Sequence, residues 1–132
     1  QNDSVMQSLI DDYLAYMAEA AGFHEEQARS LFGRDIPHIL LIHANALNAT
    51  ALDGLLVWFE RRGYRFIDLE EALEDPCYAL PEATTPHGFS WIRRWLLAAG
   101  GRPPWPPEIQ PRVQQRYDAL IREFSESWGV RE

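Results

Sequence analysis

The sequence has few of the residues that build disulfide frameworks, cysteine-rich metal centres or membrane spans. Cys77 is the only cysteine among 132 residues, which excludes an internal disulfide and a zinc site made of several cysteines. We expect Cys77 to pack as a small hydrophobic residue. No apolar run approaches the roughly 20 residues of a membrane-spanning helix. A membrane span is therefore not expected.

Basic residues are also scarce. Twelve Lys and Arg against twenty Asp and Glu give a net charge of −8, and the basic residues form no run. This charge argues against a general affinity for nucleic acid or for anionic membranes. The apolar content of 46% and the aromatic content of 12% are typical of a folded, globular chain. The chain opens on Gln1 without a methionine or a signal peptide, so we expect a processed product or a piece of a longer protein.

The N-terminal region carries the period of a helix. Apolar residues recur at three- and four-residue steps, Asp3 or Ser4 fits the N-cap, and Gly33 fits the C-terminal cap. Gly22 leaves open a division into two helices. The acidic residues of this region are expected on its solvent-exposed face; they are Asp11, Asp12, Glu19, Glu25 and Glu26.

A buried strand is predicted next. Ile39–Ile42 is an unbroken apolar run, as a strand covered on both faces by helices requires. In α/β folds, chemistry is placed in the loops after the carboxyl ends of parallel strands. His43, where the run ends, is therefore the first candidate for a functional residue.

A second strand follows after a helix. The helix is predicted over 50–62, capped by Asn48 or Thr50 and ended by Gly63, and it leads to a short strand over 64–67. Strand, helix and strand with short connections form a right-handed βαβ unit, so the two strands should be parallel.

The remaining elements are expected to be helices and connectors. They are, in order, a third helix capped by Asp68 with Glu71 and ended by Asp75–Pro76, a loop over 77–88, a helix over 89–97, an extended connector over 102–107, and a last helix from Glu108 or Pro111 to Trp128. The proline-rich connector either packs Trp105 against the fold or serves as a polyproline ligand for another domain.

Two strands do not make a stable parallel sheet, because both edges would be open and the apolar faces only half covered. We therefore expect an α/β fold whose missing strands lie on another piece of the protein. In this interpretation 1–132 is a single piece of a larger domain. Its parts are a helical insertion over 1–34, the βαβ unit over 35–76, and a loop with the C-terminal helices over 77–132.

Several segments together resemble one enzyme family. They are Pro37-His38-Ile39-Leu40-Leu41-Ile42-His43, Asn45-Ala46-Leu47-Asn48-Ala49, Arg62-Gly63-Tyr64-Arg65-Phe66-Ile67 and Leu69-Glu70-Glu71-Ala72-Leu73. This region, about residues 36 to 76, is similar to the C-terminal end of polysaccharide deacetylases, the NodB-homology group or carbohydrate esterase family 4. The resemblance implies a distorted (β/α) barrel, of which this chain would hold the last strands. It also implies a secreted or periplasmic hydrolase of non-peptide carbon–nitrogen bonds that removes acetyl groups from glycans.

The resemblance assigns roles to two residues. His43 would be the general acid that protonates the departing amine, a role suited to a side chain that titrates near neutrality. Leu41 would line the apolar pocket for the acetyl methyl group. Both side chains would point to the same face of a strand, because strand side chains alternate. The substrate would be an acetylated glycan, and the partner would be the missing N-terminal half of the domain.

The family's metal-binding motifs are absent from this chain. Asp11-Asp12 is the only aspartate pair and falls within the first predicted helix, and the four histidines are not spaced for one metal site. Ala44 also replaces the aspartate that usually follows the histidine. No cofactor is therefore expected within this chain, and a divalent metal, zinc being the expected one, would belong to the complete enzyme.

A non-catalytic role is the alternative. Four tryptophans of the C-terminal region would then be anchors for a protein partner in a small interaction module; they are Trp91, Trp95, Trp105 and Trp128.

Overall fold

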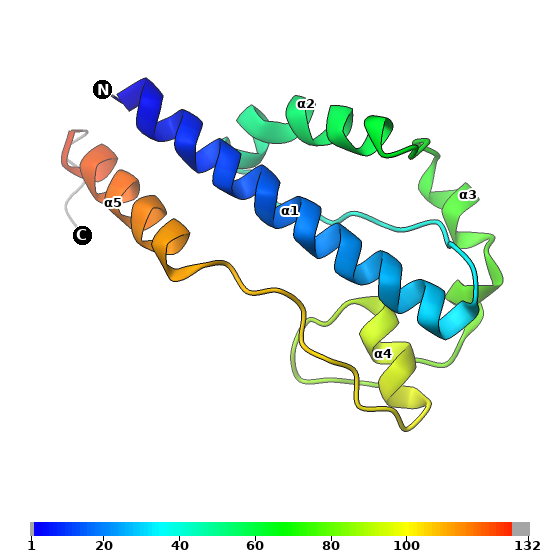
Figure 1. Cartoon of the computed structure of the whole chain (residues 1–132). Helices are drawn as coiled ribbons and strands as arrows, with labels where there is room; N and C mark the ends of the chain where they lie inside the picture. The colour runs from blue at the N-terminus through cyan, green and yellow to red at the C-terminus, as the bar shows by residue number, and fades with distance from the viewer. Residues whose placement is uncertain (1, 128–132) are drawn as a thin grey trace.

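The computed structural model describes residues 2–127, and within this range the chain is helical without any β-strand. The elements are α1 (Asn2–Phe32), α2 (Ala46–Arg61), α3 (Leu69–Leu73), the 3₁₀ turn η1 (Pro76–Ala79), α4 (Trp91–Ala98) and α5 (Pro111–Ser127). Figure 1 shows α1 as a long central helix with α2 along one side, α5 beside its N-terminal half and α4 near its C-terminal end. No helix within residues 2–127 is long and apolar enough to cross a membrane.

The central helix is a single element. α1 has 31 residues, which corresponds to about 46 Å at the usual rise per residue. It continues through Gly22, where the sequence left a break open; Ala20 and Ala21, the best helix formers, precede this glycine. Gly33 ends the helix with a φ of 67°, a left-handed conformation that glycine adopts without strain.

α2 begins earlier than predicted. Its N-cap is Asn45, whose side chain accepts a hydrogen bond from the Asn48 backbone N–H at 2.8 Å. Its C-terminal end is as predicted, since Gly63 has a φ of 91°. The helix approaches α1 closely at Gly54, where an added Cβ would lie 3.3 Å from a methyl carbon of Leu14.

The predicted α/β fold is wrong. The segments expected as parallel strands are extended but do not pair with each other, so the described residues contain no sheet, no βαβ unit and no part of a (β/α) barrel. Each of the two segments instead makes hydrogen bonds with another part of the fold. Pro37 has no N–H, and its carbonyl accepts a hydrogen bond from the Tyr78 hydroxyl at 2.6 Å. The hydroxyl of Tyr64 donates to Glu25 on α1 instead.

The main core lies at the C-terminal end of α1. Its buried members are Ala28, Ile36, Cys77, Ile92 and Trp95. α1, the start of the extended segment, η1 and α4 each contribute to this cluster. Cys77 is 2% exposed, and burial raises the pKa of its thiol to about 12, so its predicted role as a packing residue is confirmed.

The C-terminal region agrees with its prediction in outline. α4 begins after Ser90, whose side chain accepts a hydrogen bond from the Arg93 backbone N–H. A connector without regular structure leads to α5, which begins at Pro111. Leu120 of α5 is buried, and Arg116 bonds Ser8 and Asp12 of α1 at 2.7 and 2.8 Å. Trp128 lies outside the described residues.

Candidate functional site

A groove lies between α1, the loop before α2, and α5. It has a volume of about 460 Å³. Its lining is aromatic and aliphatic with a few amides and one imidazole, and it contains no Asp, Glu, Lys or Arg: Leu9, Tyr13, Tyr16, Met17, Leu41, Ile42, His43, Asn45, Leu47, Asn48, Ile109, Val113, Gln114 and Tyr117. A groove of this size and composition suits an uncharged, largely apolar ligand.

The two predicted site residues both line this groove. Leu41 and His43 lie in the extended segment that leads into α2, and both are exposed, with Leu41 retaining 86% of its accessible surface. The pairing of methyl pocket and proton donor in one cavity was predicted from strand alternation, but here a loop places both residues. Their roles as acetyl-methyl pocket and general acid stay predictions.

Two asparagines hold the loop in place. The Asn48 side chain donates to the His43 carbonyl at 2.6 Å and accepts from the Tyr13 hydroxyl of α1. The Asn45 backbone N–H also donates to the His43 carbonyl, at 3.0 Å. Burial raises the pKa of Tyr13, so this tyrosine remains a neutral donor. The position of His43 relative to α1 is therefore fixed by hydrogen bonds.

Residues 38–42, which precede His43, have backbone N–H and C=O groups without hydrogen-bond partners in the described part of the chain. Leu40 and Leu41 are 43% and 86% exposed. An extended, apolar segment with open backbone groups is a template for pairing with another chain.

The described residues do not form the metal site that the resemblance implies for the complete enzyme. No three His, Cys, Asp or Glu side chains within residues 2–127 converge in a way that could hold a metal ion. Burial lowers the pKa values of His24 and His38, so both favour the neutral form. His87 is exposed on the loop before α4. The histidines of the described part of the chain therefore do not combine into one metal site.

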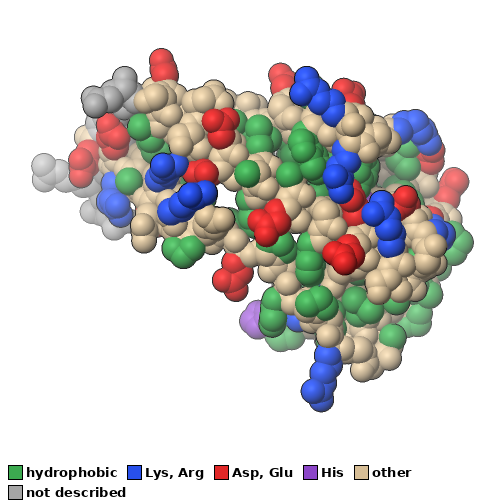
Figure 2. Space-filling model, in the orientation of Figure 1, with side chains coloured by type: hydrophobic (Ala, Val, Ile, Leu, Met, Phe, Trp, Pro, Cys, Tyr) green, Lys and Arg blue, Asp and Glu red, His purple; other side chains and the backbone are tan. Residues whose placement is uncertain are grey.

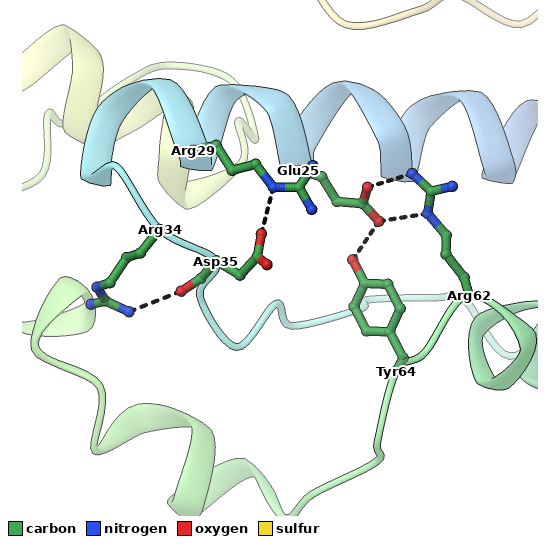
Figure 3. A network of polar contacts seen from close by, with 6 residues as sticks. All are labelled: Glu25, Arg29, Arg34, Asp35, Arg62 and Tyr64. Carbon is green, nitrogen blue, oxygen red and sulfur yellow. Dashed lines mark hydrogen bonds and ion pairs between the residues drawn. The ribbon is translucent and has the colours of Figure 1, made fainter.

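A buried carboxylate joins α1 to the end of α2. Glu25, predicted on the solvent-exposed face, is only 4% exposed. Arg62 donates to its two oxygens at 2.9 and 2.6 Å, and the Tyr64 hydroxyl donates at 2.7 Å (Figure 3). These hydrogen bonds, led by those of Arg62, lower the pKa of Glu25 to about 2 despite burial. The network is fully paired, which indicates a structural role.

A second, smaller cavity lies between α1, the start of α4 and the proline-rich connector. Its volume is about 110 Å³. The Arg93 guanidinium lies 4.0 Å from the Trp105 ring centroid and 4.8 Å from that of Phe89, and its Nη1 donates to the carbonyls of Pro103 and Pro104. Arg93 Nε and His24 Nδ1 are buried without a partner among the described residues. An unpaired buried polar atom typically costs about 1–3 kcal/mol, so these two are unusual in a folded chain.

The tryptophans proposed as anchors have different positions. Trp95 is 3% exposed in the core, and Trp91 packs edge-to-face on Tyr78. Trp105 is 68% exposed, although the Arg93 guanidinium lies over one face of its ring. Trp128 lies outside the described residues.

Some of these residues carried a signal in the sequence. The four-residue spacing of Tyr13 and Met17 places the two side chains on one face of α1. The contact of Arg93 with Trp105 carried no such signal, because it depends on the path of the connector.

No protein-family model and no curated protein matches the sequence, and no solved structure matches the fold.

Proposed function

We propose that this chain is a protein-binding module that pairs its open segment, residues 38–42, with an extended strand of a partner protein. The observation that carries the proposal is the unpaired backbone of this segment together with the exposure of Leu40 and Leu41. The groove beside it, whose lining has no Asp, Glu, Lys or Arg, receives the partner's apolar side chains. The binding surface thus lies on the extended segment instead of the Trp-rich region.

The total surface of the chain supports a partner. The chain exposes 9780 Å², whereas a compact monomer of 15.2 kDa is expected to expose about 7,100 Å². The excess of about 2,700 Å² is comparable to one partner's share of a large obligate interface. Figure 2 shows hydrophobic side chains at many places on one face, interspersed with charged ones. An exposed surface of this size that carries large hydrophobic side chains, such as Leu41 and Trp105, favours a protein partner over a small ligand.

The mode of binding follows from strand geometry. Addition of a strand to an open edge gives affinity through backbone hydrogen bonds, and neighbouring pockets give specificity through alternate side chains. Successive backbone N–H groups of an extended segment point to opposite edges. The N–H groups of Leu40 and Leu41 therefore serve different edges, and only one of them faces the partner strand.

Proline substitution tests this directly. Nine-residue peptides displayed on phage are selected against the purified chain, and the affinity of enriched peptides is measured for Leu40→Pro and Leu41→Pro. Each variant removes one open N–H without breaking a hydrogen bond of the chain. We expect one of them to weaken binding about fivefold more than the other, since one backbone hydrogen bond is lost. Leu40→Val and Leu41→Val are the matched controls that keep both the N–H and an apolar side chain.

The result that overturns the proposal is equal binding by both proline variants and the wild-type chain, with the helical circular dichroism of all three unchanged. The proposal is also overturned if the selection yields no peptide that binds the wild-type chain more tightly than it binds the proline variants. Sedimentation equilibrium identifies a second copy as the occupant if the wild-type chain forms dimers and the proline variants are monomers. That outcome would replace the partner strand with self-association.

The deacetylase role is a second candidate, and one observation favours it. Leu41 and His43 line the same groove, as a methyl pocket and a proton donor for an acetylated sugar would have to. The groove lining has no carboxylate, so a catalytic base would have to come from outside this groove. Addition of chitotetraose should then shift the NMR signals of the Leu41 methyls and the His43 imidazole, while its deacetylated form should not. Equal shifts with both sugars, or none with either, would exclude this candidate.

A further inference from the structure

We propose that the small cavity at the start of α4 binds a carboxylate group with a short apolar tail, held by Arg93 and His24. The site is separate from the groove of the proposed function. The groove uses the N-terminal half of α1, through residues such as Tyr13, whereas this cavity uses Phe23, His24 and Gln27 near its other end. The proposal therefore stands independently of strand pairing.

The charge of Arg93 has no counter-charge in the described part of the chain. Seven other arginines pair with a carboxylate of these residues, including the neighbouring Arg94 with Glu82, but Arg93 does not. Its Nη1 is used by two backbone carbonyls, and its Nε is buried and unpaired. A guanidinium with a free Nε side is a donor edge that matches the two oxygens of a carboxylate.

Two aromatic rings pack on the Arg93 guanidinium. Phe89 and Trp105 both lie over the guanidinium and make an edge-to-face pair with each other, with ring centroids 5.7 Å apart. Cation–π contacts with both rings restrict the guanidinium before any ligand arrives. The two carbonyls at Nη1 hold the opposite end of the same plane.

His24 supplies the second polar contact. Its Nδ1 is buried without a partner, and its ring lies edge-to-face with Phe23, with centroids 5.2 Å apart. A neutral imidazole protonated at Nδ1 donates to an anion without adding a second buried cation. His24 and Arg93, which come from different helices, thus line one cavity.

The cavity size and lining select the ligand. A volume of about 110 Å³ accommodates a carboxylate with one or two carbons and is too small for a sugar or a nucleotide. The side chains of Phe23, Phe89 and Trp105 and two prolines make the remaining walls mostly apolar. These walls favour a hydrocarbon tail over an inorganic phosphate. The source is a free short-chain acid or the side chain of an acidic residue in a partner protein.

The test uses the side-chain NMR signals of the complete chain. Sodium propionate, sodium acetate and the peptide acetyl-Ala-Glu-Ala-amide are titrated while the Arg93 Nε–Hε and His24 imidazole signals are recorded. We expect saturable shifts of both signals with propionate and acetate, and none with sodium chloride at the same ionic strength or with propionamide. Saturation by the peptide at a lower concentration than propionate assigns the site to a partner's acidic side chain, and saturation by propionate alone assigns it to a free acid.

Matched variants separate this site from a general charge effect. Arg93→Lys keeps the charge but lacks the donor edge, and it should weaken propionate binding about tenfold or more. Arg94→Lys alters the neighbouring guanidinium, which bonds Glu82 and the Ala83 carbonyl outside the cavity, and it should leave binding unchanged. His24→Phe fills the ring volume without the nitrogen and should also weaken binding, which covers the case in which Arg93→Lys fails to fold. Shifts that do not saturate, or saturable shifts retained in Arg93→Lys and His24→Phe, would overturn the proposal.

Discussion

The buried carboxylate of Glu25 gives the sharpest prediction about stability. Its pKa is about 2 in the folded chain and 4.5 for the ordinary side chain, a difference that corresponds to about 3 kcal/mol at neutral pH. Arg62 is 44% exposed, so solvent screening reduces this figure, and we expect about 2–3 kcal/mol. Glu25→Gln keeps the shape and removes the charge. It should lower the free energy of unfolding by about 2 kcal/mol at pH 7.

The pH dependence of this loss has a definite sign. Because the folded pKa of Glu25 is depressed, its contribution is complete above about pH 4.5 and is lost as the pH falls through about 2. At pH 2.5 we expect less than about 1 kcal/mol to remain. The difference in stability between the wild-type chain and Glu25→Gln should therefore shrink between pH 5 and pH 2.5. Other carboxylates also titrate in this range, and the comparison of the two chains removes their effect.

Urea unfolding followed by circular dichroism at each pH measures the difference. Glu26→Gln is the matched control, because Glu26 is the adjacent residue on α1 and is exposed. It should change the free energy of unfolding by no more than about 0.5 kcal/mol. The reasoning fails if Glu25→Gln costs no more than Glu26→Gln at pH 7. It also fails if the cost of Glu25→Gln is the same at pH 2.5 as at pH 7.

Three further predictions concern packing. Gly22→Ala should stabilise the chain by about 0.5–1 kcal/mol, because an added Cβ meets nothing within 4 Å. Gly54→Ala should stabilise it less, because its Cβ would lie 3.3 Å from a leucine methyl of α1. Thermal unfolding of both variants checks this order. The Cys77 thiol should react with Ellman's reagent only as fast as the chain opens, because it is 2% exposed and its pKa is raised to about 12; rapid labelling under native conditions would contradict this. Trp95→Ala should lower the free energy of unfolding in urea by about 3–5 kcal/mol, because this side chain is 3% exposed. Trp105→Ala should lower it by less than about 1 kcal/mol, because this side chain is 68% exposed. Equal losses would disprove the assignment of Trp95 to the core.

Local signals in the sequence predicted the C-terminal ends of α1 and α2 correctly, whereas both helices begin earlier than predicted. Gly33 and Gly63 end α1 and α2 with φ values of 67° and 91° because a left-handed residue is a requirement of the helix end itself. Pro111 begins α5 for a similar reason, since the first turn of a helix has no use for the missing N–H. These predictions depend on neighbouring residues alone, so a single sequence carries them.

The contacts between distant residues could not be predicted in this way. Glu25 resembles its exposed neighbour Glu26 in type and in position on a helix. Its burial depends on Arg62 and Tyr64, which lie 37 and 39 residues further along the chain. An acidic residue in a helix is usually solvated, and only the path of the chain after α2 brings the arginine to it.

The apolar run Ile39–Ile42 misled the fold prediction for a related reason. Such a run indicates that both faces need cover, but it does not say what provides the cover. In the structure Ile36, which precedes this run, reaches the core and is 7% exposed. Within the run, Leu41 remains 86% exposed. The predicted buried strand is therefore wrong: the segment has no regular structure, and Leu40 and Leu41 are exposed. An open segment replaces the expected sheet.

The open segment consists of only the five residues 38–42, which limits the number of hydrogen bonds that a partner strand can form. Pro37 has no N–H and its carbonyl is taken by Tyr78, while the His43 carbonyl is taken by the residues that cap α2. Residues 38–42 are the open part between them, so a partner strand finds two or three backbone groups of each kind on one edge. At about 1 kcal/mol each, these hydrogen bonds alone give only weak binding.

Burial of exposed side chains must supply the rest, and Leu41 is the test. Leu41→Ser should change the free energy of unfolding by less than about 0.5 kcal/mol, because the side chain is 86% exposed in the free chain. It should weaken binding of a selected peptide about tenfold or more, since full burial of a leucine is worth about 1.5–3 kcal/mol. Isothermal titration with the peptide and urea unfolding of the free variant measure the two effects separately. A loss of stability without a loss of peptide affinity would mean that Leu41 packs within this chain, and the segment would then not be a binding edge.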